Sequence, residues 1–193
     1  LLSGNSLGEA VNPVRTSVGV LAIAVSGADG IYVEESDDLT VGNVVSSSSL
    51  TAGTVVNAVQ NDASVSTVSS ATQSDVVSTG GNGSISLNTA NGSLTLSSGS
   101  AVLNPSTGAV SAHGSGKVRL SAGGASSDVV MQGNAGVSSG SGSITVLAGS
   151  DVTVGLGADV VTGSVGTIEV EAFGGAVSLS VSSDLVSTSG SIR

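Results

Sequence analysis

The amino-acid sequence predicts an all-β protein, a parallel β-solenoid with about three short strands and 24 residues per turn. The main observation is a repeated segment in which a glycine and a polar residue precede an apolar–polar–apolar alternation. Its copies are Gly92–Leu96, Gly116–Leu120, Gly142–Val146, Gly166–Val170 and Gly190–Arg193. Their first apolar residues are separated by 24, 26, 24 and 24 residues. Alternation with period two is typical of a strand buried on one face, and a fixed period in this range indicates stacked units.

The residues between these copies predict two further strands in each turn. The runs in the last two intervals are Asp151–Val154 with Asp159–Val161, and Ala176–Val181 with Asp184–Val186. Gly, Ser, Asn and Asp separate these runs, and these residues tolerate tight corners. The 26-residue interval has its extra residues in Gly123–Ser127, which we interpret as a longer corner loop.

The composition fits a narrow aliphatic core and argues against one class of partner. Hydrophobic residues make up 39% of the 193 residues, yet the chain has one Tyr, one Phe and no Trp, so aromatic rings cannot fill a wide core. A mean hydropathy of +0.43 argues against disorder. The net charge is −10 and there are only four Lys and Arg residues, too few to neutralise a run of phosphates, so we expect no nucleic-acid partner.

Taken in order, the chain begins with an irregular stretch, residues 1–17, and its first firm strand is Leu21–Val25. Strands follow at Gly30–Val33 and Leu39–Gly42. Residues 43–75 predict an irregular excursion from a single solenoid segment that spans residues 1–193. Regular spacing resumes at Val76, Ile85, Leu94, Val102, Val110 and Val118. Three strands per turn then predict about seven or eight turns.

The ends of the chain and its longest apolar run are relevant to membrane insertion and to localisation. The longest aliphatic run, Gly19–Val25, is far shorter than the roughly 20 residues of a membrane-spanning helix, so we expect no membrane insertion. The chain opens without a Met or a basic signal segment, and it ends at Arg193 within a strand. We therefore expect a segment of a longer protein. The absence of cysteine leaves the redox compartment open.

Several segments resemble giant repetitive bacterial surface proteins of the filamentous-haemagglutinin-like, adhesin-like kind. They are Gly30–Gly42, Gly83–Leu87, Ser111–Gly116, Gly142–Leu147 and Gly166–Ala172. The resemblance extends over most of the chain from about residue 18 onward. It implies a right-handed parallel β-helix, secretion to an extracellular or cell-surface location, and a structural or adhesive role.

Acidic residues form the first candidate site. Glu34, Glu35, Asp37 and Asp38 are clustered, and their oxygens are ligands that Ca²⁺ accepts, but the spacing is not that of an EF-hand loop. We favour solvated corner carboxylates over a calcium site. Five aspartates precede second or third strands, where each either caps its corner by accepting a backbone N–H or shares a bridging cation, and we favour the cap. These are Asp38, Asp128, Asp151, Asp159 and Asp184.

The remaining candidates are weaker. Gly80–Leu87 is similar to glycine-rich calcium β-roll repeats, but Ile85 replaces the ion-binding aspartate and no second copy follows. His113 has no neighbouring ligand residue, so we expect an exposed corner. Glu169 and Glu171 face outward on one strand, roughly 7 Å apart, without an apolar pocket to raise a carboxyl pKa. No catalytic residue, cofactor site, metal site or enzyme activity is predicted.

Two function hypotheses remain. The first is a structural, rod-forming repeat of a secreted surface or filament protein, stacked head to tail with itself or with tandem copies through its open edges. The second is an adhesin module that recognises a host or matrix glycan or protein on its flank or on the 43–75 excursion. Whether the ends dock in a continuous sheet distinguishes the two.

The repeat also predicts a register. One inward column contains Leu94, Val118, Ile144, Ile168 and Ile192, with Leu96, Leu120, Val146 and Val170 beside it. On the outward side, Arg193 must then lie next to Glu169. Arg119 must lie next to Thr145.

Overall fold

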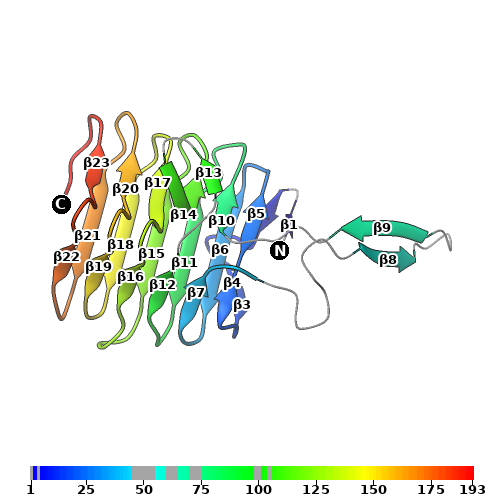
Figure 1. Ribbon diagram of the computed structural model, residues 1–193, viewed down its shortest axis with the longest axis horizontal. Helices are drawn as coiled ribbons and strands as arrows, with labels where there is room; N and C mark the ends of the chain where they lie inside the picture. Colours follow the sequence, from blue (N-terminus) through cyan, green and yellow to red (C-terminus); the bar gives the residue numbers. More distant parts are fainter. Residues whose placement is uncertain are drawn as a thin grey trace.

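The structure is a computed structural model. It describes residues 5–44, 75–97 and 108–193 in full, and the backbone of strand residues 2–3, 55–59, 65–69, 101–103 and 106–107. Within these ranges every regular element is a β-strand, and the strands of the coil follow one another along the long axis of the molecule (Figure 1). The all-β prediction is confirmed.

Three parallel sheets form the walls of the coil. Sheet I contains β2 (Ser6–Leu7), β6 (Gly30–Glu35), β11 (Ile85–Thr89), β15 (Val118–Ala122), β18 (Ile144–Ala148) and β21 (Ile168–Ala172), and β3 (Val14–Thr16) also pairs with β6. Sheet II contains β4 (Val20–Leu21), β7 (Leu39–Val41), β12 (Leu94–Leu96), β16 (Val129–Met131), β19 (Val152–Val154) and β22 (Val177–Leu179). Sheet III contains β1 (Leu2–Ser3), β5 (Ile23–Val25), β10 (Val76–Ser78), β14 (Ser106–Ala112), β17 (Gly136–Ser139), β20 (Val160–Thr162) and β23 (Leu185–Ser187).

Each turn contributes one strand to each sheet, and successive turns pair in register. Val118 pairs with Ile144, Ile144 with Ile168, and Ile168 with Ile192. The intervals from Ile144 to Ile168 and from Ile168 to Ile192 are each 24 residues, as predicted. The prediction of a parallel β-helix with about three strands per turn is therefore confirmed.

The predicted register is wrong at Leu94 and Leu96. Leu94 lies in sheet II, where it pairs with Leu39 and Val129, whereas Val118 of sheet I pairs with Ile85. This turn is longer than the turns that follow it, because β13 (Ala101–Leu103) is inserted before β14 and pairs with it in antiparallel. The main path of sheet III has seven strands, and Ile192 begins a further turn of sheet I, so the described coil has about seven turns, within the seven or eight expected.

Residues 43–75 contain two described strands, β8 (Val55–Val59) and β9 (Val65–Ser69). They pair with each other in antiparallel and form a separate two-stranded sheet. Most of the predicted excursion lies outside the described residues.

The core is a stack of aliphatic side chains from alternate positions of the strands. The following residues are at most 1% exposed: Ile31, Ile85, Val118, Ile144 and Ile168 in sheet I; Leu39, Leu94, Val129 and Val152 in sheet II; and Ile23, Val76, Val110, Val137 and Val160 in sheet III. Burial of each such side chain stabilises the fold by roughly 1.5–3 kcal/mol. No aromatic ring is needed, because the interior of the coil is narrow.

The glycine of the repeated motif is explained at the corner between sheets III and I. A Cβ added to Gly142 would collide with the carbonyl oxygen of Gly116 in the turn before. The same carbonyl accepts a hydrogen bond of 2.7 Å from the buried hydroxyl of Ser139. Thr162 repeats this contact one turn later, donating to the Gly142 carbonyl at 2.7 Å. The corner thus needs a glycine for close approach and a hydroxyl to satisfy the buried carbonyl.

Candidate functional site

The acidic cluster of residues 34–38 does not form one site. Glu34 lies 3.2 Å from Arg15, its partner on the neighbouring strand β3. Asp38 accepts a hydrogen bond of 2.7 Å from the backbone N–H of Ser93 in the next turn. Within the described residues, no group of three or more His, Cys, Asp or Glu side chains could hold a metal ion.

Glu35 is fully buried, so the expectation of a solvated corner carboxylate is wrong for this residue. Its carboxylate accepts hydrogen bonds from the Thr16 hydroxyl at 2.6 Å and the Val18 N–H at 3.0 Å. The N–H and the hydroxyl of Ser36 donate to the other oxygen at 2.9 and 3.2 Å. Burial alone would raise the pKa of Glu35, but these four hydrogen bonds outweigh it and the pKa lies below its ordinary value.

Four of the five corner aspartates accept backbone N–H groups, as expected, but from the following turn. Asp128 accepts from the N–H of Asp151 at 2.9 Å, and Asp151 accepts from that of Ala176 at 2.6 Å. Asp159 accepts from the N–H of Asp184 at 3.0 Å. Each carboxylate extends the ladder by one hydrogen bond before its strand begins, so these residues join turns to one another.

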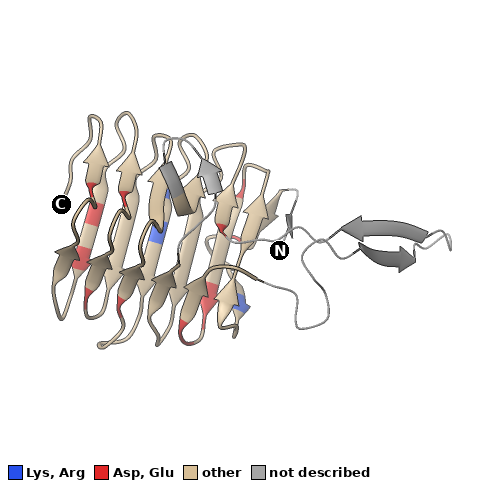
Figure 2. Cartoon of the chain, in the orientation of Figure 1, with Lys and Arg blue, Asp and Glu red and all other residues tan. Residues whose placement is uncertain are grey.

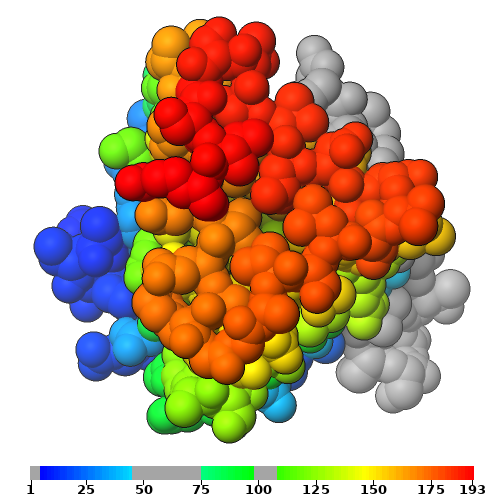
Figure 3. Space-filling view, turned by 90° about the vertical axis from the view of Figure 1, so that its left-hand side faces the viewer, coloured from blue at the N-terminus to red at the C-terminus, as the bar shows by residue number. Residues whose placement is uncertain are grey.

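The C-terminal end of the described coil faces the viewer in Figure 3, and several apolar side chains of its last strands are exposed. Val177 and Leu179 continue the inward columns of sheet II, directly above Val152 and Val154. They are 40% and 46% exposed, whereas the two valines below them are fully buried. Ile192 lies above Ile168 and is 47% exposed.

Backbone groups are open at the same end. β22 and β23 are the last strands of sheets II and III in the described chain. In sheet I a further turn begins, because Arg193 exchanges hydrogen bonds of 2.9 and 3.0 Å with Ile168 and Val170. The end therefore offers both apolar side chains and strand edges to a neighbour.

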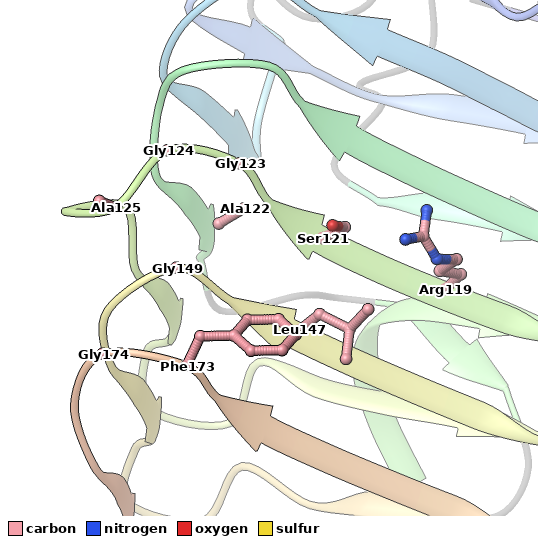
Figure 4. Close-up of a pocket in the computed structure, with 10 residues that line it drawn as sticks. All are labelled: Arg119, Ser121, Ala122, Gly123, Gly124, Ala125, Leu147, Gly149, Phe173 and Gly174. Carbon is pink, nitrogen blue, oxygen red and sulfur yellow. The ribbon is translucent and has the colours of Figure 1, made fainter.

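The outer face of sheet I contains two hollows that share one side chain, Arg119. The larger, about 620 Å³, lies at the corner after β15 and is lined by Leu147 and Phe173 (Figure 4). The smaller, about 230 Å³, lies toward the N-terminus and is lined by Tyr32. Sequence reasoning missed this face, although Tyr32 and Phe173 are the only Tyr and Phe of the chain.

Other predicted residues on the surface lie where the register places them. Arg193 is 3.2 Å from Glu169, which confirms the predicted cross-strand ion pair. Arg119 pairs with Thr145, also as predicted. His113 is exposed, as expected for a corner residue.

No helix of sufficient length and apolarity to cross a membrane is found among the described residues. No protein-family model matches the chain, and comparisons with curated proteins and with solved structures find no match.

Proposed function

We propose that this chain is a rod-forming structural unit of an extracellular or cell-surface filament, joined end to end to units of its own kind. The observation that carries the proposal is the uncovered apolar end formed by Val177, Leu179 and Ile192. These side chains belong to the core columns by register, and no described turn lies above them. The resemblance to filamentous-haemagglutinin-like surface proteins supports the extracellular location.

The occupant that fits this end best is the N-terminal end of another unit. Parallel strands at the N-terminal end present the complementary edge of the same sheets, since β2, β3 and β4 begin sheets I and II. At that end Leu21 of β4 continues the inward column of Val41 and is only partly buried. Such a head-to-tail contact is heterologous and does not close on itself, so it produces a filament and not a ring or dimer.

The test is sedimentation of the 193-residue chain over a range of concentrations. We expect association that grows with concentration. Leu179→Lys should raise the dissociation constant by about 10-fold or more, because docking would bury an unpaired ammonium group. Thr153→Lys is the matched control, since Thr153 is on the outward side of the adjacent strand β19 and adds the same charge away from the end.

Equal association of both variants would contradict the proposed contact surface. A chain that stays monomeric at all concentrations would contradict end-to-end assembly of this unit. A second function, ligand binding on the flank, is favoured by the hollows beside Arg119.

A further inference from the structure

The outer face of sheet I has features that rod formation does not require. Its two hollows lie on either side of Arg119, and together they extend across successive strands of the sheet, along the coil axis. Tyr32 and Arg119 stand in one outward column, with Ser86 between them. Tyr32 lies on β6, and Phe173 directly follows β21. These two strands are four strand spacings apart, about 19 Å. The face is thus long enough for a linear ligand of several units.

The larger hollow has an exposed aromatic side. Phe173 is 67% exposed, and its ring lies next to Leu147 (Figure 4). Glycines line the corner at three successive levels, at Gly123, Gly149 and Gly174, so no side chain fills the space in front of the ring. An exposed ring beside open backbone is a surface on which the apolar face of a flat ligand can pack.

The charge of the face is unusual for this acidic chain. Two of the four cations, Arg15 and Arg193, have carboxylate partners within 3.2 Å. The other two, Lys117 and Arg119, are exposed on β15 or directly before it and have no ion pair among the described residues. Figure 2 shows this basic position in the middle of the coil, with acidic positions on β6 and β21.

The flanking acids limit the charge of the ligand. Glu34 and Glu171 share one outward column with Ser121, and each stands two strand spacings from it, about 10 Å. A polyanion would lie against both. A ligand with a single carboxylate at Arg119 does not place negative charge next to Glu34 or Glu171. The Arg119 guanidinium can bind this carboxylate with two parallel hydrogen bonds.

We propose that this face binds a glycan that ends in one carboxylate-bearing sugar and whose other sugars are uncharged. The carboxylate lies at Arg119, the apolar face of the sugar ring packs on Phe173 and Leu147, and the Ser121 hydroxyl bonds a sugar hydroxyl. Further sugars extend toward Tyr32 in the smaller hollow. The site is on the flank, and Arg119 and Ser121 lie two strand spacings from β21, the last strand of the sheet I path. Phe173 directly follows β21, so binding is measured at concentrations at which the chain is a monomer.

The probes are 3′-sialyllactose, which has one carboxylate, and lactose, which has none. Binding is measured by titration with NMR detection of the Gly123 and Gly124 amides. We expect millimolar or tighter binding of 3′-sialyllactose and at least about 10-fold weaker binding of lactose. Arg119→Gln should weaken 3′-sialyllactose by about 10-fold or more and leave lactose unchanged. Phe173→Ala should weaken both.

Matched controls separate the site from general charge and apolar effects. Lys117→Gln removes the same charge two residues away, outside both hollows, and should weaken 3′-sialyllactose by less than about 3-fold. Leu156→Ala removes another exposed apolar side chain at a different corner and should have no effect.

Three outcomes would overturn the proposal. They are no binding of 3′-sialyllactose, equal loss in Arg119→Gln and Lys117→Gln, or tighter binding of the acidic peptide acetyl-Ser-Phe-Glu-Ser-amide than of the sugar. The last outcome would assign the face to a protein partner.

Discussion

Glu35 shows how a single residue joins two turns of the coil. It ends the inward series of β6, after Ile31 and Val33, and its carboxylate binds Thr16 and Val18 of the preceding turn. Four donors satisfy the buried charge, so the residue stabilises the N-terminal turn.

Glu35→Gln should lower the free energy of unfolding by about 2 kcal/mol, because an amide cannot replace a charged acceptor of four hydrogen bonds. Since the folded pKa of Glu35 is depressed, its contribution is present above the ordinary value of 4.5 and is lost as pH falls through the folded pKa. Urea unfolding at pH 7 and below pH 4.5 measures both effects. The difference between wild type and Glu35→Gln should shrink on acidification, whereas Glu171→Gln, at an exposed carboxylate, should differ little from wild type throughout. A constant difference would disprove the linkage.

Gly142 tests the close approach of successive turns. Gly142→Ala should destabilise the fold by about 1–3 kcal/mol, since its Cβ would collide with the Gly116 carbonyl oxygen. Gly19→Ala is the control, because nothing lies within 4 Å of the added Cβ at that position. Chemical unfolding of the two variants decides the point: similar stabilities would mean that the corner is looser than described.

At the scale of the element, side chains lengthen the backbone ladders. Asp151 precedes β19 and accepts the N–H of Ala176, which precedes β22 in the next turn. Asp128 makes the same contact one turn earlier. The strands of sheet II are only two or three residues long, so one added hydrogen bond per strand is a large fraction of each ladder.

Asp151→Ala should therefore lower the free energy of unfolding by about 1 kcal/mol, and Asp151→Asn should recover most of the loss by keeping an acceptor oxygen. Hydrogen exchange of the Ala176 amide gives the local reading. We expect faster exchange in Asp151→Ala than in wild type. Unchanged exchange would show that the carboxylate does not hold this group in solution.

At the scale of the whole molecule, one continuous core runs along the coil, and its side chains become exposed only in the last described turn. Val152 and Val177 occupy the same column one turn apart, but Val152 is fully buried and Val177 is 40% exposed. The position along the coil, and not the residue type, therefore sets how much each side chain contributes.

Val152→Asp should lower the free energy of unfolding by about 3 kcal/mol or more, because it buries an unpaired carboxylate. Val177→Asp should cost far less in dilute solution, where the end is open to water. Thermal unfolding at low concentration makes this comparison. Equal losses would indicate that the C-terminal end is already covered, by the chain itself or by a second copy.

The sequence by itself determined the fold class and much of the register. The alternation arises because each strand buries one face, and the near-constant interval arises because the turns have almost equal lengths. Together they identify the inward column of Val118, Ile144, Ile168 and Ile192, and also the Glu169–Arg193 pair. These features repeat locally, and the residues that show them are close in sequence.

Only the tertiary structure decided which sheet a given strand joins. Gly83–Leu87 and Gly92–Leu96 have the same pattern, because strands of sheets I and II bury alternate residues in the same way. Their sheets differ because the length of each turn, including the insertion before β14, sets which strand lies next to which. The hydrogen-bond donors around Glu35 and the hollows beside Arg119 could not be predicted from the sequence for the same reason. Both features are formed by residues of different turns.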